Sequence, residues 1–134
     1  MIYRDSTTKN IDINQIRSIR KSIGWQPRSE KKWKEILFKS SFVYSVYDEK
    51  KLIGMGRLVE DGIMCMFYDI VVHKKYQGKG IGKLIVSKLI EQTKGKKYCS
   101  VSLFTEKDKI KFYEKLGFKI DNFGMELKNL NLNI

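Results

Sequence analysis

Three glycines within five positions form the part of this sequence that most clearly suggests chemistry. The segment from Tyr76 to Lys83 reads Tyr-Gln-Gly-Lys-Gly-Ile-Gly-Lys, follows an apolar run and begins a helical pattern. Glycine lets the backbone approach a ligand closely and adopt conformations that other residues resist. The first turn of a helix also presents unpaired N–H groups at the positive end of the helix dipole. These features predict a site for a phosphate or pyrophosphate group, to which Lys79 and Lys83 add positive charge.

The same glycines could simply connect a strand to a helix, and the segment alone leaves that interpretation open. Two other nucleotide-binding patterns fit poorly. A P-loop requires Ser or Thr after Gly-Lys, whereas Leu84 follows Gly82-Lys83. A Rossmann fingerprint requires Gly-x-Gly-x-x-Gly and an acidic residue about 20 residues later. The spacing of Gly78, Gly80 and Gly82 does not match it.

Metal chemistry is not indicated by the residue types. Cys65 and Cys99 are the only cysteines, each lies in an apolar run, and His73 is the only histidine. Zinc sites need closely spaced Cys and His ligands. We therefore expect no metal site, and we expect both thiols to be reduced and buried.

The elements that must position the glycine segment can be read from the hydrophobic pattern. Asp12, with Gln15 three residues later, has the pattern of a capping box at a helix start, and Ser29 can cap a second helix. Alternating apolar residues then predict consecutive strands. The hairpin signal at Asp61-Gly62 indicates that these strands form an antiparallel meander. The expected strands are 2–3, 41–47, 51–59, 63–72, 98–104, 118–123 and 125–130, and the expected helices are 13–23, 29–37, 82–90 and 107–116.

This order of elements predicts an α/β fold with a mixed sheet. The chain has 134 residues, of which 42% are hydrophobic, so we expect a single domain over residues 1–134 with one core. No apolar run reaches the roughly 20 residues that a transmembrane helix needs. The first ten residues lack the apolar stretch of a secretory signal. We expect a soluble, cytoplasmic protein with no membrane partner.

The formal charge of +12 could attract nucleic acid, an anionic membrane or an acidic ligand. The lysines are spread over nearly every segment, however, and no RNA-binding motif or helix-turn-helix pattern organises them. We therefore expect no specific nucleic-acid partner. A ligand rich in phosphate would use part of the positive charge.

Two segments, taken together, resemble the GNAT superfamily of acetyl-CoA-dependent N-acetyltransferases. Residues 77–82, Gln-Gly-Lys-Gly-Ile-Gly, match its Q/R-x-x-G-x-G/A pattern, and residues 69–73 are similar to the strand that precedes it. Residues 112–118, Phe-Tyr-Glu-Lys-Leu-Gly-Phe, are similar to a second hallmark of the family. Order and separation also agree, so the resemblance extends over about residues 41–123.

The resemblance implies a mostly antiparallel mixed sheet, flanked by helices and splayed at the motif strand, where the pantetheine arm of acetyl-CoA would lie. A backbone N–H near Val71 would polarise the thioester carbonyl, a contact worth about 3–4 kcal/mol in other acyl transfers. The family is often dimeric, so a homodimer is a further expectation. The cofactor-binding residues that the resemblance implies are Ile70, Val71, Val72, Gln77, Gly78, Lys79, Gly80, Ile81, Gly82, Lys83 and Phe112.

Tyr113 is the general acid that the resemblance implies, because a phenol near the sulfur can protonate the departing thiolate. Without the resemblance, a core aromatic would be the better interpretation. The amine must also lose a proton, and the base is less certain. Asp69, Glu60, Asp61 and Glu106 are candidates, and Asp69 is favoured because its apolar neighbours would raise its pKa. The asparagine that the family often has near residues 105–108 is missing here.

The acceptor is expected opposite the cofactor, over the first two helices and the meander. Arg57 is the most informative residue there, since a buried arginine usually has an anionic partner. We hypothesise that Arg57 or Arg28 places a carboxylate-bearing or polar acceptor. Two other functions stay open: a non-catalytic acyl-CoA-binding regulatory domain and, less favoured, a basic nucleic-acid-associated protein. The side chains available for acceptor specificity are Trp25, Arg28, Trp33, Tyr44, Arg57 and Tyr68.

Overall fold

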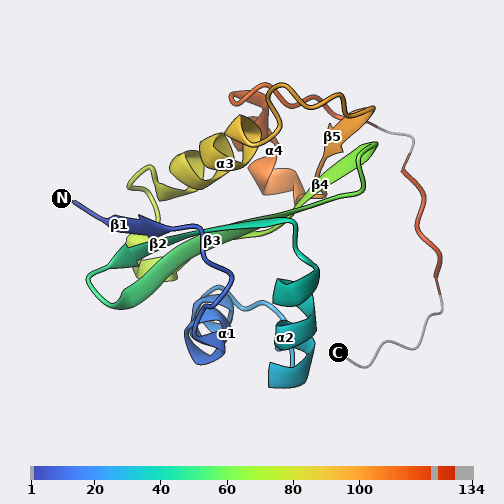
Figure 1. Ribbon diagram of the computed structural model, residues 1–134. Coiled ribbons are helices and arrows are strands. Elements are labelled where there is room, and N and C mark those ends of the chain that lie inside the picture. The colour runs from blue at the N-terminus through green and yellow to red at the C-terminus, as the bar shows by residue number, and fades with distance from the viewer. Residues whose placement is uncertain (1, 122–123, 129–134) are drawn as a thin grey trace.

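A computed structural model describes residues 2–121 and 124–128 and shows an α/β fold built on one mixed five-stranded sheet (Figure 1). The strand order is β1-β2-β3-β4-β5. All neighbouring strands are antiparallel except β4 and β5, which are parallel. The elements are β1 (Arg4–Ser6), α1 (Ile13–Ser22), α2 (Glu30–Lys39), β2 (Phe42–Asp48), β3 (Lys51–Glu60), β4 (Met64–Val72), η1 (Lys74–Tyr76), α3 (Ile81–Glu91), β5 (Ser100–Ser102), η2 (Lys107–Lys109) and α4 (Ile110–Glu114).

Helices cover both faces of this sheet (Figure 1). On one face, α1 and α2 bury Ile16 and Trp33 against β2 and β3. On the other face, α3 buries Ile85 and Leu89 against alternate residues of the same strands. Strands that are apolar on both faces therefore belong at the centre of the sheet, as their near-continuous apolar pattern predicts.

The predicted helix caps at Asp12 and Ser29 are confirmed, but one predicted capping interaction is wrong, and the helix predicted over 107–116 is a 3-10 turn followed by the short α4. The N–H of Asn14 donates to the Asp12 carboxylate at 2.9 Å, and that of Lys32 donates to the Ser29 hydroxyl at 3.1 Å. Gln15 does not complete a capping box. Its side-chain oxygen instead accepts from the N–H of Leu52 at 2.8 Å. Gln15 therefore connects α1 to the start of β3, because this buried strand end offers it a better partner than the helix end.

The sheet splays at β4. Parallel pairing with β5 involves only Met64, Cys65 and Met66. Beyond Met66, the β4 edge that faces away from β3 has no strand partner among the described residues. The splayed sheet that the family resemblance implied is therefore present, and it leaves a row of backbone groups open.

The predicted closing strands are wrong where the structure can test them. The described parts of these predictions, residues 118–121 and 125–128, contain no strand, and residues 122–123 and 129–130 lie outside the described residues. Met125 and Leu127 are 98% and 76% exposed. Alternating hydrophobicity cannot make a strand unless a neighbouring strand pairs with it, and no strand pairs with these residues in the described part of the chain.

Smaller differences concern the sheet edges and the thiols. The first strand begins two residues later than predicted, and β5 is shorter than the predicted strand over 98–104. Cys65 is buried as predicted, but Cys99 is exposed because it precedes β5 at the edge of the sheet. Within the described residues, no helix is long and apolar enough to cross a membrane. The same residues contain no group of three or more His, Cys, Asp or Glu side chains that could hold a metal ion.

Candidate active site

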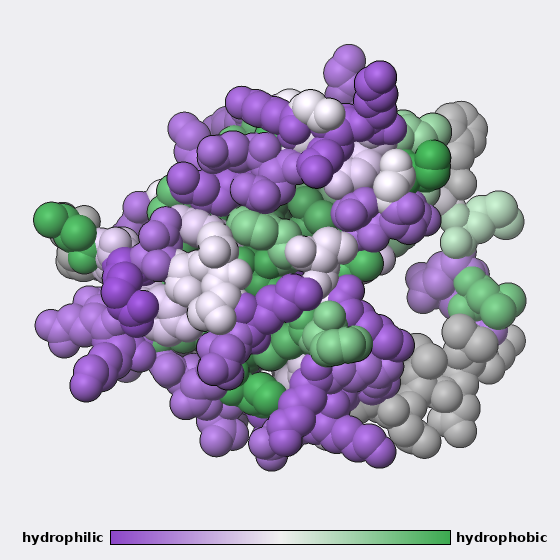
Figure 2. All heavy atoms as spheres, viewed as in Figure 1, coloured by the Kyte–Doolittle hydropathy of each residue, from purple (hydrophilic) through white to green (hydrophobic). Residues whose placement is uncertain are grey.

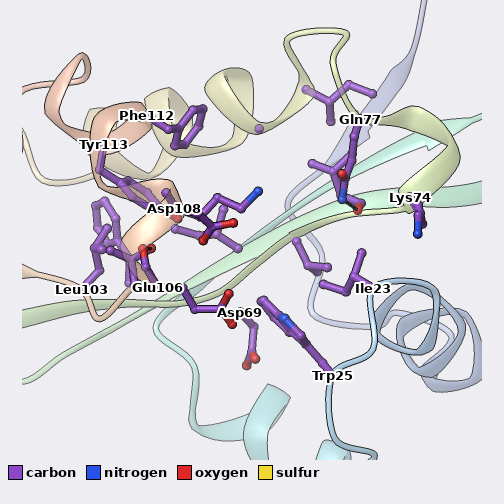
Figure 3. Close-up of a pocket in the computed structure, with 18 of the residues that line it drawn as sticks. Ile23, Trp25, Asp69, Lys74, Gln77, Leu103, Glu106, Asp108, Phe112 and Tyr113 are labelled. Atoms are coloured by element: carbon purple, nitrogen blue, oxygen red, sulfur yellow. Dashed lines mark hydrogen bonds between the residues drawn. The ribbon is translucent and has the colours of Figure 1, made fainter.

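A cleft of about 1240 Å³ opens where β4 parts from β5. Drug-sized ligands usually occupy about 300–1,000 Å³, so this cleft suits a larger molecule. Its walls are the end of α1, the second half of β4, the start of α3 and the segment that leads into α4. Figure 3 shows Phe112 and Tyr113 on the α4 side, Trp25 on the α1 side and Asp69 between them. In Figure 2, a paler, apolar strip lies between the hydrophilic surfaces above and below it.

The glycine segment forms an open backbone surface at the start of α3. Gly78 and Gly80 have φ angles of +78° and +83°, which glycine adopts without steric cost. A Cβ atom at either position would have no other atom within 4 Å, so space beside the backbone is free. Gly80 is the N-cap of α3 and makes no side-chain capping bond. The first amides of α3 are thus available to an anion, and the open glycine backbone leaves room for a phosphate or pyrophosphate group there.

Most predicted cofactor residues meet in this cleft. Gln77 also donates from its side-chain amide to the carbonyl of Val72 at 3.2 Å, which fixes the glycine segment to the end of β4. Lys79 is the exception: its ammonium lies 5.7 Å from the centroid of the Tyr76 ring and does not line the cleft. The predicted residues that do line it are Ile70, Val71, Val72, Gln77, Gly78, Gly80, Ile81, Gly82, Lys83 and Phe112.

Tyr113 lines the same cleft from α4. Its ring packs edge-to-face against Phe112 and Phe118, with centroid distances of 4.9 and 5.8 Å. Burial raises the pKa of Tyr113 to about 12. The phenol therefore keeps its proton throughout the neutral range and is able to donate it.

Asp69 is held differently from what its sequence neighbours predicted. Its φ angle is +52°, and the pairing of β3 with β4 shifts register opposite it, between Met55 and Arg57. Burial by itself would raise the pKa of Asp69, but the charges and hydrogen bonds of Arg57 and Arg28 outweigh burial and lower it. The predicted raised pKa is therefore wrong, because arginines distant in sequence surround this carboxylate.

The other candidate bases separate clearly by position. Glu60 accepts from the N–H of Gly62 at 2.6 Å, and Asp61 accepts from the N–H of Met64 at 2.8 Å. Both carboxylates thus serve the turn between β3 and β4 and do not line the cleft. Glu106 does line it and is drawn beside Asp108 on the α4 side (Figure 3). The sequence did not single out Asp108, because nothing in its local pattern distinguishes it from other surface carboxylates.

The groups considered for acceptor specificity also divide. Trp25 and Tyr68 line the cleft, whereas Arg28 and Arg57 do not line it. Trp33 and Tyr44 are 0% and 2% exposed and belong to the two core clusters on opposite faces of the sheet. The sequence predicts the acceptor over the first two helices but does not single out the residues at the end of α1, from Lys21 to Gly24, that form one wall of the cleft. A helix end gives no signal about which cleft it faces.

Comparison with known proteins identifies relatives of this site. Residues 39–120 match the acetyltransferase (GNAT) domain. An uncharacterized N-acetyltransferase, ycf52, of Pyropia yezoensis is 36% identical over 126 residues, which cover 90% of this chain and 72% of that protein. The chloroplastic GCN5-related N-acetyltransferase 2 of Arabidopsis thaliana is 38% identical over 79 residues, covering 58% of this chain and 31% of that protein.

Solved structures share the fold over nearly the whole chain. A Staphylococcus aureus protein of unknown function superposes with a TM-score of 0.86 and 27% identity, over 96% of this chain and 100% of that one. A predicted acetyltransferase from Clostridium acetobutylicum, solved with acetyl-CoA, has a TM-score of 0.74 and 17% identity over 95% of each chain. At that identity, the second likeness concerns the fold alone.

Proposed function

This chain belongs to the GNAT acetyltransferase family, and from that membership we propose that it transfers an acetyl group from acetyl-CoA directly to a primary amine of a small molecule or peptide. One observation supports the proposal most strongly. The open amides at the start of α3 and the protonated phenol of Tyr113 line the same cleft, although the residues come from distant parts of the chain. An acyl-CoA bound by its pyrophosphate at α3 would extend along β4 toward this phenol.

The chain's own groups suggest a role for each step. A free backbone N–H of β4 near Val71 polarises the thioester carbonyl. Glu106, directly or through a water molecule, accepts a proton from the amine, whose pKa is near 10 before binding. Tyr113 gives its proton to the departing thiolate. Acetyl-CoA supplies the activated acetyl group.

Asp69 takes a different part in this proposal from the one its position in the motif strand first suggested. A carboxylate with a lowered pKa that already accepts hydrogen bonds from three arginines is a poor base. We therefore assign it a positioning role, in which it fixes the bend of β4 beside the thioester.

Several finer statements stay predictions. They are the single domain over residues 1–134, the homodimer and the cytoplasmic location. One relative, from Arabidopsis thaliana, is named as chloroplastic, so a plastid is a second location to examine.

The test is release of free CoA from acetyl-CoA across a panel of amines, with Tyr113→Phe as the comparison. We expect turnover by the unchanged protein and a fall in kcat of about 100-fold or more in the variant, because general acid catalysis is worth about 10²–10⁴-fold. The Kd for acetyl-CoA should change little, since the ring remains. Tight binding of acetyl-CoA without turnover of any amine would instead support a non-catalytic acyl-CoA-binding domain.

A further inference from the structure

Three arginine side chains converge on one carboxylate, on the face of the sheet that α1 and α2 cover. Arg20 lies on α1, Arg28 lies between α1 and α2, and Arg57 lies on β3. Their nearest nitrogen-to-oxygen distances to Asp69 are 2.8, 2.9 and 2.7 Å. The four side chains are called the arginine cluster below.

The arginine cluster has more positive than negative charge. Both oxygens of Asp69 are used, since Arg28 donates to each of them and Arg20 and Arg57 donate to one apiece. The other hydrogen-bond acceptors that the arginines contact are neutral: the carbonyl of Gln26 for Arg20 and, at 3.4 Å, the hydroxyl of Ser40 for Arg57. Three guanidinium groups thus share one carboxylate, which leaves a net charge of +2.

Water has little access to this excess of positive charge. The side chain of Arg20 is only 7% exposed, and its Nε has no hydrogen-bond partner. Burial, followed by the charge of Arg28 and then that of Arg57, lowers the pKa of Arg20. Holding like charges close together in a largely buried place costs free energy unless an anion binds to them.

The cluster is partly open to solvent and adjoins the cleft through Asp69, although Arg28 and Arg57 do not line the cleft themselves. The side chains of Arg28 and Arg57 are 21% and 12% exposed, and each guanidinium has N–H groups left over, because arginine carries five donors. Arg57 lies 4.8 Å from the ring centroid of Tyr68, a residue that lines the cleft. A group bound to these donors would therefore lie on the α1–α2 side of β4, next to Asp69 and Tyr68, which line the cleft.

We propose that Arg28 and Arg57 bind a carboxylate or phosphate group of the amine acceptor, and that Asp69 holds both guanidinium groups in position for this contact. Guanidinium groups suit such a role because their planar N–H pairs match the oxygens of both anions. The inference rests on the proposed acetyltransferase function, since it names the class of amine that the same site would take. Acidic side chains of the cleft, Glu106 and Asp108, lie on the α4 side, where the amine would be.

Matched pairs of amines test the substrate class. Acetyl transfer to β-alanine is compared with transfer to β-alaninamide, and transfer to phosphoethanolamine with transfer to ethanolamine. We expect kcat/KM to be about tenfold or more higher for the anionic member of at least one pair, because that member alone gains a charged hydrogen bond. The pair with the larger ratio distinguishes a carboxylate from a phosphate. Equal kcat/KM within both pairs would overturn the proposal.

An arginine variant tests which residues carry the preference. Arg28→Gln should raise KM for the preferred anionic amine about tenfold more than KM for its neutral counterpart, through loss of the charged contact. Arg17→Gln, an exposed arginine on α1, is the matched control and should leave the ratio unchanged. Loss of the preference in both variants would indicate a general charge effect and contradict the proposed site.

A binding measurement separates this inference from the proposed function. The midpoint of thermal unfolding is measured with CoA present, in sodium phosphate, sodium acetate and sodium chloride at equal ionic strength. We expect phosphate or acetate to raise the midpoint above that in chloride for the unchanged protein but not for Arg28→Gln. That result without turnover of any amine would keep the anion site and reject the proposed function. Turnover with no anion preference and no such rise would keep the proposed function and reject the anion site.

Discussion

Burial and neighbouring charge give different protonation states to Tyr113 and Asp69, the two titratable side chains that the motifs indicated. Tyr113 is buried among aromatic rings, so its pKa rises to about 12 and it keeps a proton to give. Asp69 is also buried, yet nearby guanidinium groups lower its pKa and keep it ionised. Burial thus favours a proton donor where no charge is near and, where guanidinium groups outweigh it, leaves a fixed negative charge.

Glu106 is the carboxylate that we propose as the base, and it lines the cleft. Glu106→Gln should lower kcat by about 100-fold, because removing a general base costs about 10²–10⁴-fold, while KM for acetyl-CoA changes little. Asp108→Asn, which alters a neighbouring carboxylate of the same wall, is the matched control. A larger loss of kcat in Asp108→Asn than in Glu106→Gln would move the assignment to Asp108.

Replacing Asp69 should destabilise the protein in a pH-dependent manner. Its folded pKa is lowered, so its contribution to stability is present above the unfolded value of about 4 and is lost as pH falls through the folded pKa. Asp69→Asn should cost about 3–5 kcal/mol at pH 7, because buried arginines lose their partner.

Urea unfolding of Asp69→Asn between pH 7 and pH 3 checks this prediction. The difference from the unchanged protein should shrink below pH 4 or so, as the native carboxyl also becomes neutral. Asp12→Asn is the control, since asparagine is an equally good N-cap and the site is exposed. An unchanged urea midpoint at pH 7 in Asp69→Asn would show that the ion pairs add no net stability.

At the scale of elements, the approach of α3 to the sheet sets the shape of the cofactor end of the cleft. Two glycines of β3 make that approach possible, since a Cβ on Gly56 would lie 2.6 Å from Ile85 and one on Gly54 would lie 2.9 Å from it. The start of α3 can therefore lie close to the end of β4, where the open amides and the free strand edge face one ligand.

Gly56→Ala should force α3 away from β3. The added methyl would overpack the core at a cost of about 1–3 kcal/mol in the free energy of unfolding. It should also raise KM for acetyl-CoA, since the first turn of α3 would shift. Urea unfolding and initial-rate kinetics measure the two effects. Gly124→Ala is the control, because its Cβ would lie 3.8 Å from Phe104, an ordinary contact; equal effects of both substitutions would contradict this account.

For the molecule as a whole, the central strands join two hydrophobic clusters into one structure. Val43 and Tyr44 are adjacent in β2 and point into clusters on opposite faces of the sheet. Neither cluster can lose its packing without disturbing a strand that the other also needs. The structure therefore supports the proposal of one domain.

This arrangement predicts a single cooperative unfolding transition. Trp25 and Trp33 report on the α1–α2 side, whereas far-ultraviolet circular dichroism reports on all helices and strands. The two signals should change at the same urea concentration, as expected of a two-state domain of this size. A fluorescence midpoint below the circular dichroism midpoint would show that the α1–α2 layer unfolds separately.

Sequence alone determined the parts of this protein that depend on local backbone demands. The glycine segment at a helix start, the helix caps at Asp12 and Ser29, and the strands buried on both faces were all predicted. Each follows from which conformations a residue tolerates and from the period of its apolar neighbours. Tyr113 was found through a motif, and it lines the cleft.

Tertiary structure alone decided which distant residues meet. Asp69 seemed to be a carboxylate among apolar neighbours, but Arg20, Arg28 and Arg57, which lie 49, 41 and 12 residues away along the chain, converge on it. The predicted closing strands failed for a related reason, since a strand exists only beside a partner. Local pattern fixes the conformation of a segment, whereas the packing of helices against a shared sheet fixes its neighbours, and those neighbours set the charge of this site.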